Sequence, residues 1–267
     1  MSLGGSIFTH NAIEFDYCIA ESIASLCGVC DEVVVLDAQS TDSTVDLLNE
    51  CTKKFDNLRV ITGAKWDCAK NYDRLAILAN EAKSHLNTDW HFMLQADEVL
   101  HECSYPYIRE CIKQERGGFR SFFSRRFNLF GDLNHYLRFN LEQHKKPCSD
   151  AVIRLAKTFY PAVGDAESVG VDPAYLCHDS IDEIQIWHYG FVRRGSHLIN
   201  KVIDMQSWFH GEGSQPDSRV VEFKNENKDF DWTRFKERSD LAKIECKHPR
   251  FSRKWAAERQ KEKPALD

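Results

Sequence analysis

The sequence predicts an α/β fold in which helices flank a mostly parallel sheet. Apolar runs typical of buried strands alternate with segments of helical spacing through the first 100 residues. Two of these strands end on carboxylates, and 267 residues of which 42% are hydrophobic can form one large core. Because parallel strands end at the same edge of a sheet, we expect a ligand crevice at their carboxyl ends.

The first two strands are short and buried. Residues 6–9 form the first, and a helix follows with Ile19, Ile23 and Leu26 on one face. Residues 33–36 are four consecutive apolar residues, three of them β-branched, which is typical of a strand buried on both faces. This second strand ends at Asp37. The following elements are expected to be a helix over 45–55, a strand over 58–62, a helix over 67–86 and a strand from Trp90.

The strand from Trp90 leads into two adjacent carboxylates, Asp97 and Glu98. On its own, such a pair is more often a surface turn that follows a core strand. Asp37 stands at the corresponding end of the second strand, and Ser40, Thr41 and Ser43 offer N-caps for the next helix. The recurrence of carboxylates at one edge favours a binding site there.

Several motifs in a fixed order carry a resemblance to a known family. They are Asp37 with residues 40–44 (Ser-Thr-Asp-Ser-Thr), residues 69–71 (Ala-Lys-Asn), 95–98 (Gln-Ala-Asp-Glu), 164–166 (Gly-Asp-Ala), 188–190 (His-Tyr-Gly) with Val192 and Arg193, and 248–249 (His-Pro). With them the chain resembles the family-2 glycosyltransferases of the GT-A fold, in a subset with Gln-Ala-Asp-Glu where the family has Asp-x-Asp.

The resemblance implies a glycosyltransferase that moves a sugar from a nucleotide-diphosphate sugar to an acceptor hydroxyl, with inversion. It implies a divalent cation, Mn²⁺ or Mg²⁺, held by Asp97 and His188, and it favours a UDP-sugar. Residue 95 is a glutamine, and a neutral amide is a poor ligand for a hard cation, so metal dependence is open. Donor contacts are expected from Thr9, Asn11, Asp37, Asp42, Lys70, Gln95, Ala96 and Arg193.

Glycosyl transfer also needs a base for the acceptor hydroxyl. Asp165 and Glu167 are the candidates, since they follow an expected strand over 151–156 and a glycine that permits close approach. Asp165 is the first choice, although Gly-Asp is also an ordinary turn dipeptide. His188 ends a strand-like run over 183–187, where a structural histidine is the competing interpretation.

The domain organisation is predicted from a change in sequence pattern, from alternating strands and helices to a helical and polar C-terminal part. We expect a catalytic core over 1–195, with a nucleotide-sugar half over 1–100 and an acceptor half over 101–195. Residues 196–267 are expected to form a helical extension packed on the core, with a helix over 196–209, a polar loop over 211–231 and a closing helix over 251–263. Aromatic residues from Phe119 to Phe139 are interpreted either as core or as a sugar-stacking surface.

Net charge, the length of apolar runs and the cysteine content narrow the class of protein and its expected location. A net charge of -6 argues against a protein whose affinity depends mainly on phosphate contacts. No apolar run approaches the ~18 residues of a membrane span, and residues 1–5 lack a signal-peptide pattern, so we expect a cytoplasmic protein, with peripheral membrane attachment left open. Ten cysteines are then expected as free thiols. The acceptor stays undetermined among glycans, lipid-linked glycans, proteins and modified nucleic acid.

Two other functions stay in view. One is a non-catalytic nucleotide- or glycan-binding module that lost its metal ligand at position 95. The other is a sugar-phosphate nucleotidyltransferase, which needs a glycine-rich phosphate loop after the first strand. Residues 10–12 (His-Asn-Ala) do not provide that loop.

Overall fold

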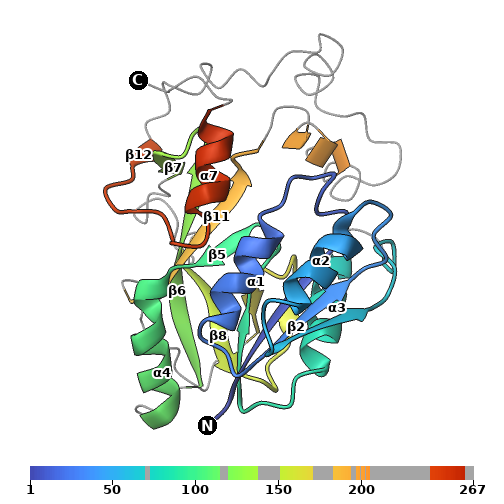
Figure 1. Cartoon of the computed structure of the whole chain (residues 1–267). Coiled ribbons are helices and arrows are strands. Elements are labelled where there is room, and N and C mark those ends of the chain that lie inside the picture. The colour runs from blue at the N-terminus through green and yellow to red at the C-terminus, as the bar shows by residue number, and fades with distance from the viewer. Residues whose placement is uncertain are drawn as a thin grey trace.

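The computed structural model describes residues 1–69, 73–114, 120–137, 151–170, 183–193, 197–198, 200–201, 203–204 and 241–261. It has the predicted α/β architecture, with a central sheet between layers of helices (Figure 1). The expected helix over 196–209 and the expected loop over 211–231 lie largely or wholly outside the described residues, as does Lys70.

The N-terminal half of the sheet is parallel, as predicted. It runs in the order β4, β1, β2, β3, which are Trp90–Met93, Leu3–Thr9, Glu32–Asp37 and Leu58–Thr62. In this register Thr9 pairs with Asp37, and Asp37 with Thr62, so the three strands end together. Every residue from 33 to 37 is buried, which explains why this strand reads as a continuous apolar run.

Helices cover both faces of this half. The helices α1 (Ile19–Cys27), α2 (Thr44–Thr52) and α4 (Tyr105–Gln114) contribute to one core cluster with Ile7, Val33 and Val35 of the strands. Helix α3 (Asp73–Ser84) packs on the other face against Phe8 and Leu36. We expected α3 to include Asp67, but residues 66–69 form turns and bends, with the Cys68 N–H donating to the Lys65 carbonyl.

The second half of the sheet is mixed rather than parallel. Strand β8 (Ala151–Lys157) pairs antiparallel with both β4 and β6 (Ser121–Phe130), and β6 pairs antiparallel with β7 (His135–Leu137). Strand β11 (Gln185–Phe191) runs parallel to β6 and antiparallel to β5 (Glu98–Leu100). The strand expected over 183–187 begins two residues later than predicted, at Gln185, and extends through His188 to Phe191. Phe127 and Phe130 are buried, which confirms the core interpretation for these two aromatic residues.

Smaller elements complete the description. A short hairpin joins β9 (Ala162–Val163) to β10 (Ser168–Val169), and a 3-10 helix, η1 (Glu102–Ser104), precedes α4. Strand β12 (Leu241–Lys243) extends the sheet beside β7. Helix α7 (Arg253–Gln260) lies near β11 and β7 (Figure 1). It buries Trp255 in a third cluster, and its Arg259 pairs with Asp16. None of the helices in the described ranges has the length and apolar character that crossing a bilayer requires.

Candidate active site

A cavity of about 290 Å³ opens at the carboxyl ends of the parallel strands. Thr9 and His10 reach it from the end of β1, and Gln95, Ala96 and Asp97 from the segment after β4. The second half of the chain supplies further lining residues, which are Arg126 and Asn128 from β6, His188 and Phe191 from β11, and Asp165 and Glu167 from the separate β9–β10 hairpin. The crevice predicted at this edge is therefore present, and two halves of the chain form it together.

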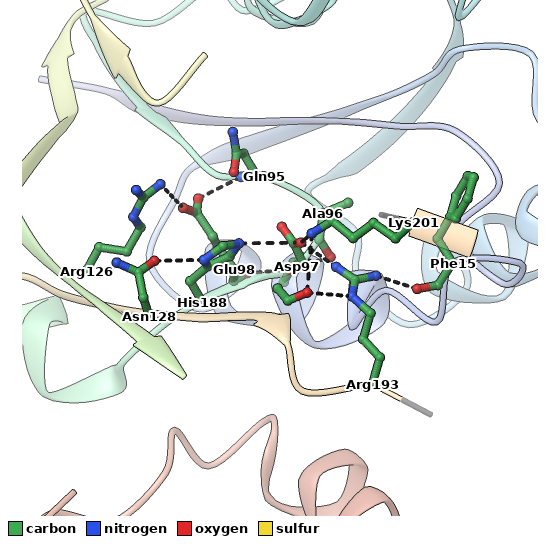
Figure 2. A network of polar contacts seen from close by, with 12 residues as sticks. Phe15, Gln95, Ala96, Asp97, Glu98, Arg126, Asn128, His188, Arg193 and Lys201 are labelled. Atoms are coloured by element: carbon green, nitrogen blue, oxygen red, sulfur yellow. Dashed lines mark hydrogen bonds and ion pairs between the residues drawn. The ribbon is translucent and has the colours of Figure 1, made fainter. Parts of the chain in front are cut away.

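Asp97 lies at the centre of a cluster of cationic side chains. Its Oδ2 accepts hydrogen bonds from Arg193 Nη2 at 2.5 Å and Lys201 Nζ at 2.9 Å. His188 Nε2 lies 3.5 Å from the same oxygen. Figure 2 shows these side chains converging on Asp97 from β11 and the segment beyond it. We call Asp97, His188, Arg193 and Lys201 the Asp97 centre.

The charges of the Asp97 centre set its protonation states. Burial alone would raise the pKa of Asp97, but the neighbouring charges, led by Lys201, hold it well below its usual range. Burial, together with the charge of Arg193, lowers the pKa of Lys201 to about 8 despite the opposing pull of Asp97. Two cations thus share one carboxylate, and the centre is suited to receive an anion.

His188 is oriented by a hydrogen bond on the far side of its ring. Its Nδ1 lies 2.8 Å from Asn128 Oδ1, an oxygen that can only accept, so Nδ1 carries the proton (Figure 2). Burial lowers the pKa of His188, which keeps the ring neutral at pH 7 despite Asp97. The lone pair on Nε2 then faces Asp97, an arrangement that is typical of metal-binding histidines.

Asp97 and His188 therefore fit a divalent cation as two of its ligands. No group of three or more His, Cys, Asp or Glu side chains is arranged around a common point in the described part of the chain. Mg²⁺ and Mn²⁺ commonly take their other ligands from water and substrate phosphates. Lys201, however, already occupies the Asp97 oxygen that such a cation would use.

Asp165 and Glu167 face the same cavity from the turn between β9 and β10. We call residues 164–167 the carboxylate loop. Burial, and then the charge of Glu167, raise the pKa of Asp165. Burial would also raise the pKa of Glu167, but Arg126, whose Nη2 donates to Oε1 at 2.6 Å, lowers it below its ordinary value. The two carboxylates thus differ in basicity because, within the described part of the chain, Glu167 has a close cationic partner of this kind and Asp165 does not.

The expected donor residues separate into two groups. Thr9, Gln95 and Ala96 line the cavity, and Arg193 belongs to the Asp97 centre. The Oγ1 of Thr9 is buried without a hydrogen-bond partner among the described residues.

The residues of the second group lie at the ends of β1 and β2 and in the loops that follow these strands. Asp37 is 4% exposed and accepts from Ser40 Oγ at 2.5 Å, and Asn11 Oδ1 accepts from the Thr41 N–H at 2.8 Å. Asp42 Oδ2 accepts from the Glu14 N–H at 2.8 Å. Asn11, Asp37 and Asp42 lie at the predicted edge of the sheet but are not among the residues that line the cavity.

Sequence reasoning missed several cavity residues. His10 and Trp66 stack with their ring planes 6° apart and form one wall. Arg126 lines the cavity from the buried strand β6, and Arg154 in β8 does not line the cavity but is fully buried and pairs with Glu98. A charged residue in a buried strand must have a partner, so this pattern was an available signal. Lys201 follows Arg193 at a distance along the chain that no motif singles out.

Comparisons with known proteins give distant likenesses of fold. The crystal structure of S. aureus TarS matches 90% of this chain over 46% of its own, with 13% identity and a TM-score of 0.46. TarS 1-349 in complex with UDP matches 56% of this chain at 19% identity, with a TM-score of 0.37. A putative glucose-1-phosphate thymidylyltransferase from Bacillus anthracis matches 59% of this chain over 72% of its own, with 11% identity and a TM-score of 0.40.

The chain spans only 39% of the length of that UDP complex of TarS. No family model matches the sequence, and no curated protein is similar to it. At these identities and TM-scores the likeness concerns the arrangement of the chain, and it assigns no substrate.

Proposed function

We propose that this chain is a glycosyltransferase that uses a nucleotide-diphosphate sugar. The observation that carries the proposal is one cavity with two chemically different sides. The Asp97 centre offers fixed positive charge on one side, and the carboxylate loop offers a carboxylate with a raised pKa on the other. Glycosyl transfer needs both, because a diphosphate leaves while an acceptor hydroxyl loses its proton.

The chemistry assigns a role to each side. The bond between the anomeric carbon and the diphosphate oxygen breaks, and Lys201, which lines the cavity, stabilises the charge that develops on that oxygen. The acceptor oxygen forms the new bond to the anomeric carbon from the opposite face, and Asp165 accepts its proton. Asp165 is a better base than Glu167 because, among the described residues, no arginine pairs with it as closely as Arg126 pairs with Glu167.

A divalent cation held by Asp97 and His188 would add charge neutralisation for the diphosphate. The donor would lie along the end of β1, where Thr9 and His10 line the cavity. The stacked His10 and Trp66 rings provide a flat wall for the nucleobase or the sugar. We keep UDP as the favoured nucleotide, and the acceptor class as undetermined.

Asp165→Asn tests the proposal because it keeps the shape of the side chain and removes the base. Turnover should fall about 10²–10⁴-fold while the affinity for the nucleotide stays close to that of the wild type. Asp56→Asn, at an exposed position, is the matched control. The two quantities are measured with UDP-, GDP- and dTDP-sugars, by product release and by calorimetry.

Three other outcomes would contradict parts of the proposal. If nucleotide affinity falls in Asp165→Asn and turnover per bound donor does not, Asp165 positions the donor and Glu167 becomes the candidate base. If the wild type binds nucleotide sugars and never turns them over, the chain is a binding module. If it releases pyrophosphate from a nucleoside triphosphate and a sugar phosphate, it is a nucleotidyltransferase.

A further inference from the structure

Glu98 directly follows Asp97 but lies in a fully enclosed environment. It is 0% exposed, and its Oε1 accepts from Arg154 Nη2 at 2.6 Å with Arg126 Nη1 3.6 Å away. Its Oε2 accepts the backbone N–H of Gln95 at 2.9 Å. Figure 2 shows Glu98 between Arg126 and the backbone of Gln95. A carboxylate removed from water requires such partners, so Glu98 fixes the position of all three.

The same three partners hold the carboxylate loop. Each uses another donor group to bind a different one of three consecutive loop residues. The bonds run from Gln95 Nε2 to the Asp165 carbonyl at 3.3 Å, from Arg154 Nη1 to the Ala166 carbonyl at 2.7 Å, and from Arg126 Nη2 to Glu167 Oε1 at 2.6 Å. A single buried carboxylate therefore organises every one of these contacts.

The loop is held in a conformation that it would not favour by itself. Gly164 has φ +60° and Ala166 has φ +57°, and the second value lies in the left-handed region that alanine rarely adopts. Ala166 is also completely buried. Strained backbone of this kind persists where its surroundings fix it, and it gathers at functional sites. The three donors are the surroundings that fix it here.

The chemistry at position 95 explains why a glutamine stands there. A glutamine amide can donate a hydrogen bond to the Asp165 carbonyl, whereas an ionised aspartate or glutamate can only accept. An acidic residue at position 95 would place a carboxylate beside that carbonyl and lose the bond. Gln95 therefore has a role of its own, which is to donate a hydrogen bond to the Asp165 carbonyl.

We propose that Gln95 and Glu98 are positioning residues that hold the carboxylate loop in register with the Asp97 centre. Gln95 acts by its direct bond to the loop, and Glu98 acts through Gln95, Arg126 and Arg154. The proposal rests on the function proposed above, since the loop carries the base. Misplacing a reacting group by about 1 Å can cost on the order of 100-fold in rate, so this bond is relevant to turnover.

Gln95→Met tests the bond because methionine keeps the length of the side chain and lacks the N–H donor. The matched control is Gln39→Met, since Gln39 Nε2 makes the same kind of bond to the Gly63 carbonyl, at 3.2 Å, away from the cavity. We expect Gln95→Met to lower kcat about tenfold or more and to change the KM for the donor less than about threefold. Gln39→Met should keep wild-type kinetics. Gln95→Asp should lower kcat as Gln95→Met does.

Two kinetic results would overturn the proposal. One is wild-type kcat in Gln95→Met. The other is a gain of Mn²⁺-dependent turnover in Gln95→Asp, which would make position 95 a weakened metal site instead.

Hydrogen exchange in the ligand-free protein gives a readout that needs no substrate. The amides of residues 165–167 should exchange faster in Gln95→Met than in Gln39→Met, because the loop loses one of its three anchors. If the wild type turns over no donor, the proposed function fails while this measurement still tests the anchor. Equal exchange in the two variants would overturn the anchor whatever the enzyme does.

Discussion

Asp97 and Glu98 are neighbours in the sequence, and each is surrounded by two cationic side chains, yet they occupy two different regions. Asp97 lies on the cavity wall, with Lys201 and Arg193 from the segment that follows β11. Glu98 lies in the interior, with Arg154 and Arg126 from the strands β8 and β6. Asp97 lies in the turn before β5 and faces the cavity, whereas Glu98 is the first residue of β5 and is fully buried.

The difference teaches that burial and pairing alone do not identify a catalytic residue. Both carboxylates are nearly inaccessible and both have close cationic partners. The two carboxylates differ in what their partner residues contact. His188 and Lys201, which contact Asp97, line the cavity, whereas Arg154, Arg126 and Gln95, which contact Glu98, also bind the carboxylate loop. The predictions below test this separation, beginning with the largest expected effect.

Glu98→Gln should lower the free energy of unfolding by about 3–5 kcal/mol, because it leaves a guanidinium enclosed without its carboxylate. Asp97→Asn should lower it by less. Arg193 keeps the Gly190 and Phe15 carbonyls as acceptors, and Lys201 faces the cavity. Urea unfolding of both variants measures the two values. If Asp97→Asn is the more destabilising variant, the assignment of scaffold and site is reversed.

His91 is a buried titratable group that does not line the cavity, so its protonation affects the stability of the fold and not the site directly. His91 in β4 pairs with Ser6 Oγ at 2.7 Å, and burial, with the charges of Lys83 and Arg154, lowers its pKa to about 3. The unfolded chain binds this proton below a pH of about 6.5, and the folded protein does not until about pH 3. Stability should therefore fall as the pH drops through this window, by up to a few kcal/mol.

His91→Asn should flatten the acid dependence between pH 6.5 and pH 4.5. His85→Asn, at an exposed histidine, should leave it unchanged. Thermal unfolding across this pH range measures both variants. An unaltered pH dependence in His91→Asn would place the acid sensitivity elsewhere, with Asp97 and Glu167, whose pKa values are lowered by neighbouring cations, as the next candidates.

Lys201→Met should strengthen the binding of Mn²⁺ to the free protein by about tenfold, because it removes a cation that competes for Asp97 Oδ2. The same change should weaken the binding of UDP alone, since the diphosphate loses a positive partner. Lys83→Met is the control, as Lys83 binds the Tyr160 carbonyl away from the cavity. Calorimetry measures both affinities. Unchanged Mn²⁺ binding would mean that Asp97 is not a metal ligand.

The parallel half of the fold could be predicted from the sequence because its strands and helices have clear periodicity. The strand predicted over 58–62 was found at those bounds, and the strand that ends on Asp37 ends there in the structure. The start of α3 was predicted too early, since apolar spacing continues through a turned segment at 66–69. The strand pairing of the mixed half could not be derived from the sequence, because pairing between distant segments leaves no local pattern.

The site residues that belong to sequence motifs could be predicted. Asp97, His188 and Arg193 were expected near one another, and the structure brings them together. Lys201 and Arg126 were missed because their roles come from partners distant in sequence, Asp97 and Glu167. Asp37, by contrast, was expected at the ligand, but its oxygens are taken up by Ser40 in the loop that follows β2. Its role at the nucleotide stays a prediction.

Calorimetric titration of Mn²⁺ into the protein, with and without UDP, tests the central claim most directly. The claim is that the Asp97 centre binds the diphosphate of a nucleotide, with a cation that completes its ligands from the phosphates. We predict that UDP binds by itself, that Mn²⁺ binds weakly without UDP and tightly with it, and that Asp97→Asn abolishes this coupling. Tight Mn²⁺ binding without UDP, or no binding of UDP under either condition, would contradict the claim.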